Sequence, residues 1–397
     1  MNSHRSTQLL LILGGIAFLV QGDNYAAAPL LINIAKDLHL TISSAALSVS
    51  MYMIPFGLFT LLFGPLADRY GKAKVLNLAT FGTATFSILS ATAFNLPSLC
   101  ILRAINGAFA AAVLPVAVSL VGDSFDDSSR QNALGAIIGI MFLGGAVAPA
   151  VGGTLAFFGS WRLLYLTYGI AELVVAFIML KHLERRRGVI SRLNFRMVYK
   201  EALANKNLIK AVSILFFVGF AVFGSFMYSG DFIKTRLGYN ILAVGLLLSL
   251  FGLATAIGGR RAGTIRQRFG NKLLLFAGAL GGVSWMTMWF WYSPILIAIS
   301  LVGFGFAFIL LQSTVIETAQ QLMPQQRGTV MSLASFNMFI GGGIGIFVNG
   351  RLLNEFGFCP IFVSASIIIL LVGSVITLFL NKISKAEKES ELSITGS

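Results

Sequence analysis

Three ionisable residues lie within long apolar stretches of the chain, where a charge is costly. They are Asp23 in QGDNYAAAP, Arg103 in LRAINGAFAAA and Glu172 in LTYGIAELVV. Within a membrane span such a group costs about 2.5–3.5 kcal/mol or more. A carboxylate removed from water binds a proton more readily than one in water. We therefore predict that Asp23, Arg103 and Glu172 take part in binding and releasing a transported proton.

Each of these residues also has a plainer interpretation. Asp23 could lie at a solvated span end, since span boundaries are hard to place from sequence. Arg103 stands only a few residues after Pro97 and could extend its side chain to the outer surface. Glu172 could be a hydrogen-bonded structural carboxylate. Asp123, Asp231 and Glu317 lie at span ends, so we expect those three to be interfacial.

Most of the chain is too apolar for a soluble protein. Its 397 residues are 56% hydrophobic and 11% charged, whereas soluble domains carry about 25% charged residues. Apolar windows of about 20 residues, the length that crosses a bilayer as a helix, recur twelve times, at residues 8–32, 43–66, 73–94, 98–121, 131–158, 161–181, 208–231, 241–262, 272–291, 294–317, 328–352 and 359–381. The sequence predicts an all-α, multi-pass protein of the cell membrane with twelve transmembrane helices.

Basic residues gather in the loops on one side of these spans, which explains the net charge of +14. One loop holds Arg69, Lys72 and Lys74, and the segments 181–210 and 260–272 hold most of the others. Cytoplasmic loops carry an excess of Lys and Arg, so an even number of spans places both termini in the cytoplasm. The charge thus indicates topology, and no nucleic-acid partner is expected.

The two halves of the chain match each other. MFLGGAVAPAVGG from Met141 pairs with MFIGGGIGIFVNG from Met338 at an offset of 197 residues, and GPLADRYGKAKVL from Gly64 pairs with GTIRQRFGNKLLL from Gly263 at 199. A near-constant offset indicates duplication. The predicted domains are a six-helix bundle at 1–181, a basic cytoplasmic linker at 182–207, a second six-helix bundle at 208–381 and a disordered cytoplasmic tail at 382–397. Arg103 falls opposite the apolar Leu301, so only one half keeps the guanidinium.

The stretch GPLADRYGKAK, residues 64–74, resembles the loop motif between the second and third helices of the major facilitator superfamily, with Lys72 where Arg is usual. The resemblance covers nearly the whole chain and implies that family's fold. It also implies that Asp68 faces the start of the eleventh helix, whose free N–H groups attract a carboxylate, with Lys72 orienting it. Alternatively, the basic residues only set topology and Asp68 balances them. The predicted conformational latch comprises Gly64, Asp68, Arg69, Gly71, Lys72 and Arg327.

Two further motifs resemble those of proton antiporters in the same family. Arg103, Asn106 and Gly107 are similar to the fourth-helix motif, with Asn in place of Gln, and in related antiporters that arginine is thought to set the protonation of nearby carboxylates. Residues 135–153 resemble the antiporter motif associated with exporters, with Ala148 replacing one glycine. Its glycines let helices approach closely and its proline bends the helix. The predicted hinge comprises Gly135, Gly144, Pro149, Gly152 and Gly153.

Aromatic and polar side chains in other spans are candidates for the walls of a substrate cavity. Phe216, Phe220, Phe223 and Met227 share one helical face, which could line a pocket for apolar compounds or could face lipid or a neighbouring helix. The candidate cavity residues are Tyr52, Asn106, Phe220, Phe223, Gln312 and Asn337.

These features predict a proton-coupled exporter of small amphipathic or drug-like compounds that works by alternating access. Its expected partners are the small-molecule substrate, protons and the lipid bilayer, and we expect a monomer. The alternative is a transporter of a metabolite such as a sugar, an amino acid or a siderophore. A membrane enzyme or sensor is disfavoured, because His4, His39 and His182 lie outside the spans and no nucleotide-binding motif is present. No cofactor or metal is expected.

Overall fold

The computed structural model describes residues 3–184, 188 and 194–395, and nearly all of them are helical. The helices are α1 Ser3–Asp37, α2 Ile42–Tyr70, α3 Lys72–Ser90, α4 Leu96–Ala110, α5 Val113–Ser124, α6 Asp127–Phe158, α7 Trp161–His182, α8 Phe195–Ala204, α9 Lys206–Leu237, α10 Ile241–Phe269, α11 Lys272–Phe290, α12 Pro294–Leu322, the short 3-10 helix η1 Pro324–Gln326, α13 Arg327–Phe356 and α14 Cys359–Thr395.

Every predicted span coincides with a helix of the structure, and α4 and α5 together form the fourth span. Among the described residues, eleven segments are long and apolar enough to cross a membrane. The remaining predicted span is α3, a helix of 19 residues. It is less apolar than the others because it carries polar side chains, and Asn77, Thr80, Thr83 and Ser87 are buried against neighbouring helices. The chain is therefore an all-α, multi-pass membrane protein.

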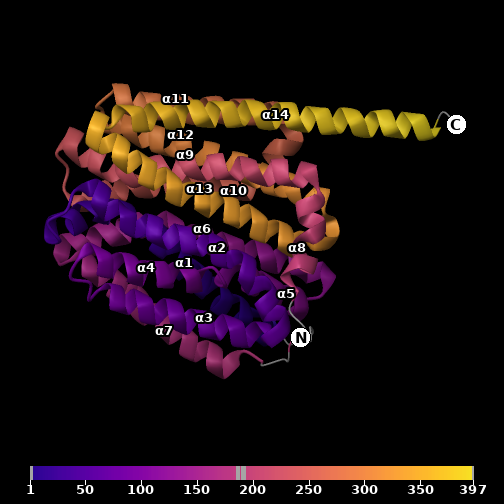
Figure 1. Ribbon diagram of the computed structural model, residues 1–397, viewed down its shortest axis with the longest axis horizontal. Helices are drawn as coiled ribbons and strands as arrows, with labels where there is room; N and C mark the ends of the chain where they lie inside the picture. The colour runs from indigo at the N-terminus through magenta and orange to yellow at the C-terminus, as the bar shows by residue number, and fades with distance from the viewer. Residues whose placement is uncertain (1–2, 185–187, 189–193, 396–397) are drawn as a thin grey trace.

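The two halves of the chain lie side by side, and each repeats the packing of the other (Figure 1). In the first half α1 packs on α6, α2 on α4 and α3 on α7; in the second half α9 packs on α13, α10 on α12 and α11 on α14. Both chain termini lie at the same end of the bundle (Figure 1). The duplication detected in the sequence is thus visible in the arrangement of the helices.

The tight turn after the second helix of each half is part of this repeat. Gly71 follows α2 with a φ of 97°, and Gly270 follows α10 with a φ of 59°. Positive φ values favour glycine, because a Cβ would crowd the following carbonyl. Gly71 also donates its N–H to the carbonyl of Ala67 and so ends α2. This requirement explains why the two loops keep glycine at matching positions.

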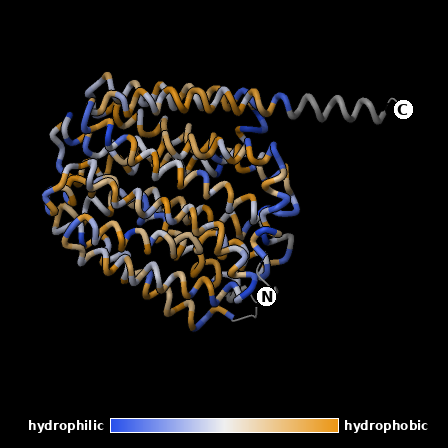
Figure 2. Tube along the Cα trace, viewed as in Figure 1, coloured by the Kyte–Doolittle hydropathy of each residue, from blue (hydrophilic) through white to orange (hydrophobic). Residues whose placement is uncertain are grey.

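The halves meet along two pairs of helices, α2 with α13 and α6 with α10. Polar residues concentrate at the two ends of the bundle, and the middle is predominantly apolar (Figure 2). This distribution suits a body that spans a bilayer, whose hydrocarbon core is about 30 Å thick.

The ends of the predicted domains differ in part from the structure. The predicted linker, residues 182–207, lies partly outside the described residues, and its described part contains α8 and the start of α9. The predicted disordered tail, residues 382–397, is helical as far as Thr395, so that α14 extends beyond the bundle (Figure 1). Lys and Glu, which recur in this tail, are strong helix formers, and the prediction gave too little weight to that preference.

Candidate functional site

The centre of the first half contains a buried ion pair between α1 and α4. A guanidinium nitrogen of Arg103, Nη1, lies 2.6 Å from Oδ2 of Asp23. The side chains of Arg103 and Asp23 are only 1% and 4% exposed. Asp23 is therefore not at a solvated span end, and Arg103 does not reach the outer surface. The structure brings two of the three residues predicted to couple protons into direct contact.

Aromatic rings and an amide hold the Arg103 side chain in place. The guanidinium carbon lies 4.3 Å from the ring centroid of Tyr52 and 4.8 Å from that of Tyr165, so the cation stacks between two π faces. Nη1 also donates to Oδ1 of Asn106 at 3.1 Å, and Asn106 donates to the carbonyl of Thr83. These contacts partly replace the water that the cation loses on burial.

Glu172 of α7 belongs to the same cluster. It is 1% exposed, interacts electrostatically with both Asp23 and Arg103, and has the hydroxyl of Thr83 within hydrogen-bonding reach. Tyr165, Tyr168 and Glu172 are spaced three and four residues apart, which places all three on one face of α7. We did not single out Tyr165 or Tyr168 from the sequence, although that spacing relative to Glu172 was a readable signal.

Several polar atoms of this cluster have no hydrogen-bond partner among the described residues. They are Oδ1 of Asp23, Nε and Nη2 of Arg103, Oε2 of Glu172 and the hydroxyls of Tyr52 and Tyr165. A buried polar group without a partner costs about 1–3 kcal/mol, and more if it is charged. The cluster therefore has hydrogen-bond donors and acceptors that no described residue satisfies.

The second half has no equivalent of this cluster. At an offset of 198 residues, Asp23, Arg103 and Glu172 correspond to the apolar residues Ala221, Leu301 and Leu370. Ala221 and Leu301 are buried. Two halves with the same helix packing thus differ at these positions, which are ionisable in the first half and apolar in the second.

The predicted hinge lies in α6, where α1 and α10 approach closely. A Cβ on Gly144 would lie 2.2 Å from the carbonyl oxygen of Phe18, and one on Gly153 would lie 2.7 Å from the carbonyl oxygen of Ile241. Gly152 similarly faces the carbonyl of Ala26. Gly135, in contrast, has open space around it. Gly144, Gly152 and Gly153 therefore permit close packing of the helices, and Gly135 makes no such contact.

Pro149 creates a specific contact between the two halves. Its missing N–H cannot bond to the carbonyl of Gly145, four residues earlier, and that carbonyl faces Gly252 of α10. The next N–H, of Ala150, donates to the hydroxyl of Ser249 on α10 at 3.0 Å. At the proline, therefore, a backbone N–H of α6 bonds to a side chain of α10 and not to a carbonyl of α6 itself.

The predicted cavity residues fall into two groups. Tyr52 and Asn106 belong to the cluster around Arg103. Phe223 is buried between the halves, with its ring centroid 5.9 Å from that of Tyr25 and 5.9 Å from that of Phe339. Phe220, Gln312 and Asn337 are partly buried, and Gln312 donates to Sδ of Met338 at 3.2 Å. Aromatic side chains thus fill the space between the halves in this conformation.

The end of the bundle that holds both chain termini is called the inner end below. The predicted latch residues lie there, where α2 ends and α13 begins. Asp68 is partly buried, and Gly71 forms the required turn. Lys72, which we expected to orient Asp68, forms an ion pair with Asp123 on α5, with Nζ 2.6 Å from Oδ2. Lys72 begins α3, which packs on α5, and its charge also acts on the carboxylate of Asp68 at the end of α2. The structure shows no ion pair between the described side chains of Asp68 and Arg327. Gly64 has open space around it, and Arg69 lies over the ring of Tyr70.

A contact that we did not predict links the inner ends of the halves. Tyr199 of α8 donates its hydroxyl to the carbonyl of Leu61 on α2 at 2.7 Å. That carbonyl is free because Pro65, four residues later, has no N–H. Tyr199 also has the hydroxyl of Ser332 on α13 within hydrogen-bonding reach, and burial raises the pKa of the phenol above 10.0, so it remains a donor. Helix α8 thus contacts both α2 and α13.

Two halves with the same packing of membrane-spanning helices, and a buried ion pair that the described residues place in the first half, indicate a membrane transporter. The sequence profile of the Major Facilitator Superfamily matches residues 13–346. The chain belongs to this family, whose members are transporters and not enzymes.

Several known proteins resemble the chain. An uncharacterized MFS-type transporter of Bacillus subtilis, YceJ, is 24% identical over 348 residues, which is 85% of this chain and 87% of that protein. The puromycin resistance protein of Streptomyces alboniger is 22% identical over 86% of this chain and 78% of its own length. An efflux pump of Gibberella fujikuroi is 36% identical over 121 residues, 30% of this chain and 21% of the pump.

Two solved structures have the same fold. A nucleoside transporter, NupG, superposes with a TM-score of 0.78 at 13% identity, over 94% of this chain and 99% of that one. A bacterial homologue of the human lysosomal transporter Spinster, in an inward-facing conformation, gives a TM-score of 0.71 at 18% identity, over 96% and 97% of the two chains.

Proposed function

We propose that this transporter is a proton-coupled exporter of small amphipathic or drug-like compounds. The observation that carries the proposal is the buried cluster of Asp23, Arg103 and Glu172, which has polar atoms to spare and an apolar counterpart in the second half. Ionisable groups at such depth are costly, so they are expected to serve ion or proton movement. The resemblance of residues 135–153 to an exporter motif supports the outward direction.

The coupling step follows from the ion pair. When Asp23 takes up a proton, its attraction to Arg103 weakens, and the guanidinium is free to strengthen its interaction with Glu172. The stacked rings of Tyr52 and Tyr165 hold the arginine within the cluster during this exchange. Tyr52 lies on α2, which packs against α13 of the other half, so a movement of Arg103 can reach the interface between the halves.

Alternating access requires contacts between the two halves that can break and form again. Midway along α2, Phe56 stacks on Phe339 of α13 with ring centroids 4.0 Å apart. At the outer ends of the same helices, the hydroxyl of Ser43 donates to Oδ1 of Asn354 at 2.8 Å. Alternating access would break contacts at one end while keeping those at the other. We propose that Asp68 and Arg327 add a further contact at the inner end when the cavity opens outward.

The energy available is sufficient for export. One elementary charge moving through 100 mV releases about 2.3 kcal/mol, which supports a concentration ratio of roughly fiftyfold. The puromycin resistance protein and the efflux pump among the relatives are consistent with a drug-like cargo, and we extend that inference to this chain only as part of the proposal.

Inverted membrane vesicles containing the transporter test the proposal. A fluorescent amphipathic compound should accumulate in them when respiration acidifies the lumen, and an uncoupler should abolish that accumulation. Accumulation that persists with the uncoupler would rule out proton coupling. A screen for transport-coupled pH changes with sugars, amino acids and siderophores addresses the alternative, since a strong response to one of these metabolites without any response to amphipathic compounds would contradict the proposed cargo.

A further inference from the structure

A groove on the outside of the second half lies between the inner ends of α9 and α14. It has a volume of about 350 Å³ and is lined on α9 by Ile209, Lys210, Ser213, Ile214 and Phe217, and on α14 by Val375 and Phe379. Apart from Lys210 and Ser213, the lining is apolar. The groove is separate from the buried cluster, which belongs entirely to the first half.

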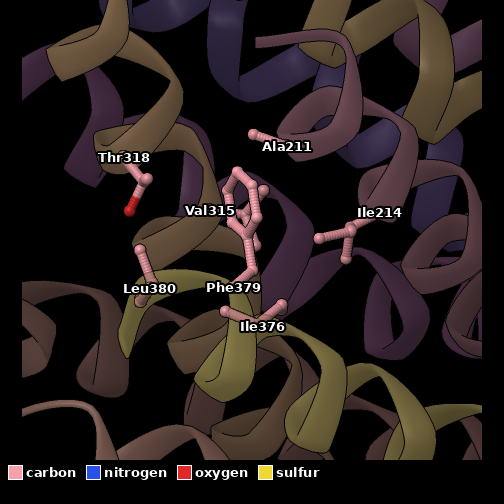
Figure 3. Close-up of a pocket in the computed structure, with 7 residues that line it drawn as sticks. All are labelled: Ala211, Ile214, Val315, Thr318, Ile376, Phe379 and Leu380. Atoms are coloured by element: carbon pink, nitrogen blue, oxygen red, sulfur yellow. The ribbon is translucent and has the colours of Figure 1, made fainter. Parts of the chain in front are cut away.

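The groove has a narrow extension toward the interior of the half. Ile214 and Phe379 also line a smaller hollow bounded by Ala211, Val315 and Ile376, which brings α12 into contact with the same site. Figure 3 shows the ring of Phe379 standing among Ala211, Ile214 and Val315. Helices α9, α12 and α14 therefore do not close completely on one another here.

The length and depth of the groove suit a lipid chain that enters from the inner leaflet. Lys210 is four residues after the start of α9, at the inner end of the bundle. Phe217 lies seven residues further along, which is about 10 Å at 1.5 Å per residue, and it is 52% exposed. Val375 on α14 is 51% exposed. The groove thus runs from the membrane interface into the hydrocarbon region.

Positive charge gathers at the mouth of the groove. Lys206 and Lys210 lie on α9, Lys382 ends the span of α14, and all three are exposed. Neither Lys206 nor Lys210 forms an ion pair with another residue that the structure describes. Two acidic side chains that the structure describes at this end, Glu201 and Glu317, are bonded to Gln326 and Arg266, respectively. Within the part of the chain whose side chains the structure describes, no carboxylate pairs with Lys206 or Lys210, so the mouth carries positive charge.

We propose that this groove binds an anionic phospholipid of the cytoplasmic leaflet, with its phosphate at Lys210 and one acyl chain along Phe217, Val375 and Phe379. Basic pockets between transmembrane helices on the cytoplasmic side suit anionic head groups, and each lysine near the surface contributes attraction to anionic lipid. The apolar lining provides the remaining contact. A bound lipid would fill the space between α9 and α14 at the inner end of the second half.

The test uses the full chain in nanodiscs of phosphatidylcholine that contain a small share of phosphatidylglycerol carrying a photoactivatable group in one acyl chain. After irradiation and digestion, mass spectrometry identifies the labelled peptides. We expect labelling in residues 209–217 and 375–379. Unlabelled phosphatidylglycerol should compete strongly, and phosphatidylcholine, inorganic phosphate and an uncharged detergent should compete weakly. Equal competition by any of the last three would overturn the proposal.

Two variants and one control distinguish the contribution of the lipid head group from that of the acyl chain. Lys210→Gln should reduce labelling at these peptides about fivefold. Val375→Trp should reduce it with every lysine in place, because the indole fills the groove. Lys74→Gln, which removes the same charge at the inner end of the first half, should leave labelling unchanged. Thermal unfolding of each variant verifies that it is folded. Undiminished labelling in both groove variants, or equal loss in Lys74→Gln, would contradict the site.

Discussion

Arg103 and Asp23 are 80 residues apart in the chain, yet their side chains meet at 2.6 Å in the centre of the first half. Both are almost fully removed from solvent. Removing two charges from water is costly, so a buried ion pair often adds little to the stability of a protein. Stability alone therefore does not explain this pair. A chemical role explains better why the chain keeps it.

The first prediction concerns the stability of this pair. Arg103→Met should lower the free energy of unfolding by about 3–5 kcal/mol, because the Asp23 carboxylate would remain buried without a partner. Adding Asp23→Asn should recover part of that loss. The matched control is Arg162→Met, which breaks the ion pair of Arg162 with Asp37, whose side chains are 33% and 45% exposed, and should cost less than about 1 kcal/mol. Thermal unfolding in detergent measures all of these, and equal losses in the two arginine variants would contradict the special status of Arg103.

The second prediction concerns Pro149. Pro149→Ala supplies an N–H that can bond to Gly145 within α6, which competes with the contact of Ala150 to Ser249 on α10. We expect export turnover to fall while stability is kept or raised. Ile346→Val, at the corresponding position of α13, should change turnover less. Equal changes in the two variants would indicate that the glycine-rich segment of α6 acts only by packing.

The third prediction concerns Tyr199 and Pro65. Tyr199→Phe removes the donor to the Leu61 carbonyl and should weaken the closed inner end by about 0.5–1.5 kcal/mol, which shifts the population toward the inward-open state. In a Pro65→Ala background the new N–H can satisfy the same carbonyl, so Tyr199→Phe should then have little effect. Spin-label distances between the inner ends of α2 and α13 measure the shift. An identical effect of Tyr199→Phe in both backgrounds would exclude this hydrogen bond as the cause.

The fourth prediction concerns the latch. Asp68→Asn should increase the inward-open population and slow turnover without loss of substrate binding, because a neutral amide interacts less with the N-terminus of α13. Crosslinking of a cysteine pair across the inner ends of α2 and α13 should decrease, with Cys100 and Cys359 replaced by serine. The matched control is Gln267→Asn, the corresponding position of the second half. Unchanged crosslinking together with normal transport would remove Asp68 from the mechanism.

Much of the fold could be predicted because a membrane imposes strong rules on the sequence. Apolar windows, basic loops and the offset between Met141 and Met338 are local signals that can be counted. The pairing of Asp23 with Arg103 could not be derived in this way, since it depends on how α1 crosses α4. The partner of Lys72 was missed for a similar reason, because Asp123 comes near it only through the packing of α3 on α5.

Other features were missed although the sequence contained the signal. Pro65 frees the Leu61 carbonyl in any helical arrangement, so a donor was to be expected there, but nothing in the sequence indicates that Tyr199 of the linker supplies it. Tyr165 and Tyr168 lie on the same face of α7 as Glu172, and their spacing alone placed them beside the ionisable cluster.

The most direct test of the account separates proton coupling from substrate exchange in proteoliposomes containing Asp23→Asn. Uptake driven by a pH gradient requires a proton to bind and leave, whereas exchange of labelled for unlabelled substrate at equal concentrations and equal pH requires only that the loaded protein change conformation. We predict that Asp23→Asn loses gradient-driven transport and retains exchange, while the surface variant Asp37→Asn retains both. Gradient-driven transport by Asp23→Asn at the rate of the unmodified protein would contradict the central claim that this buried carboxylate carries the coupled proton.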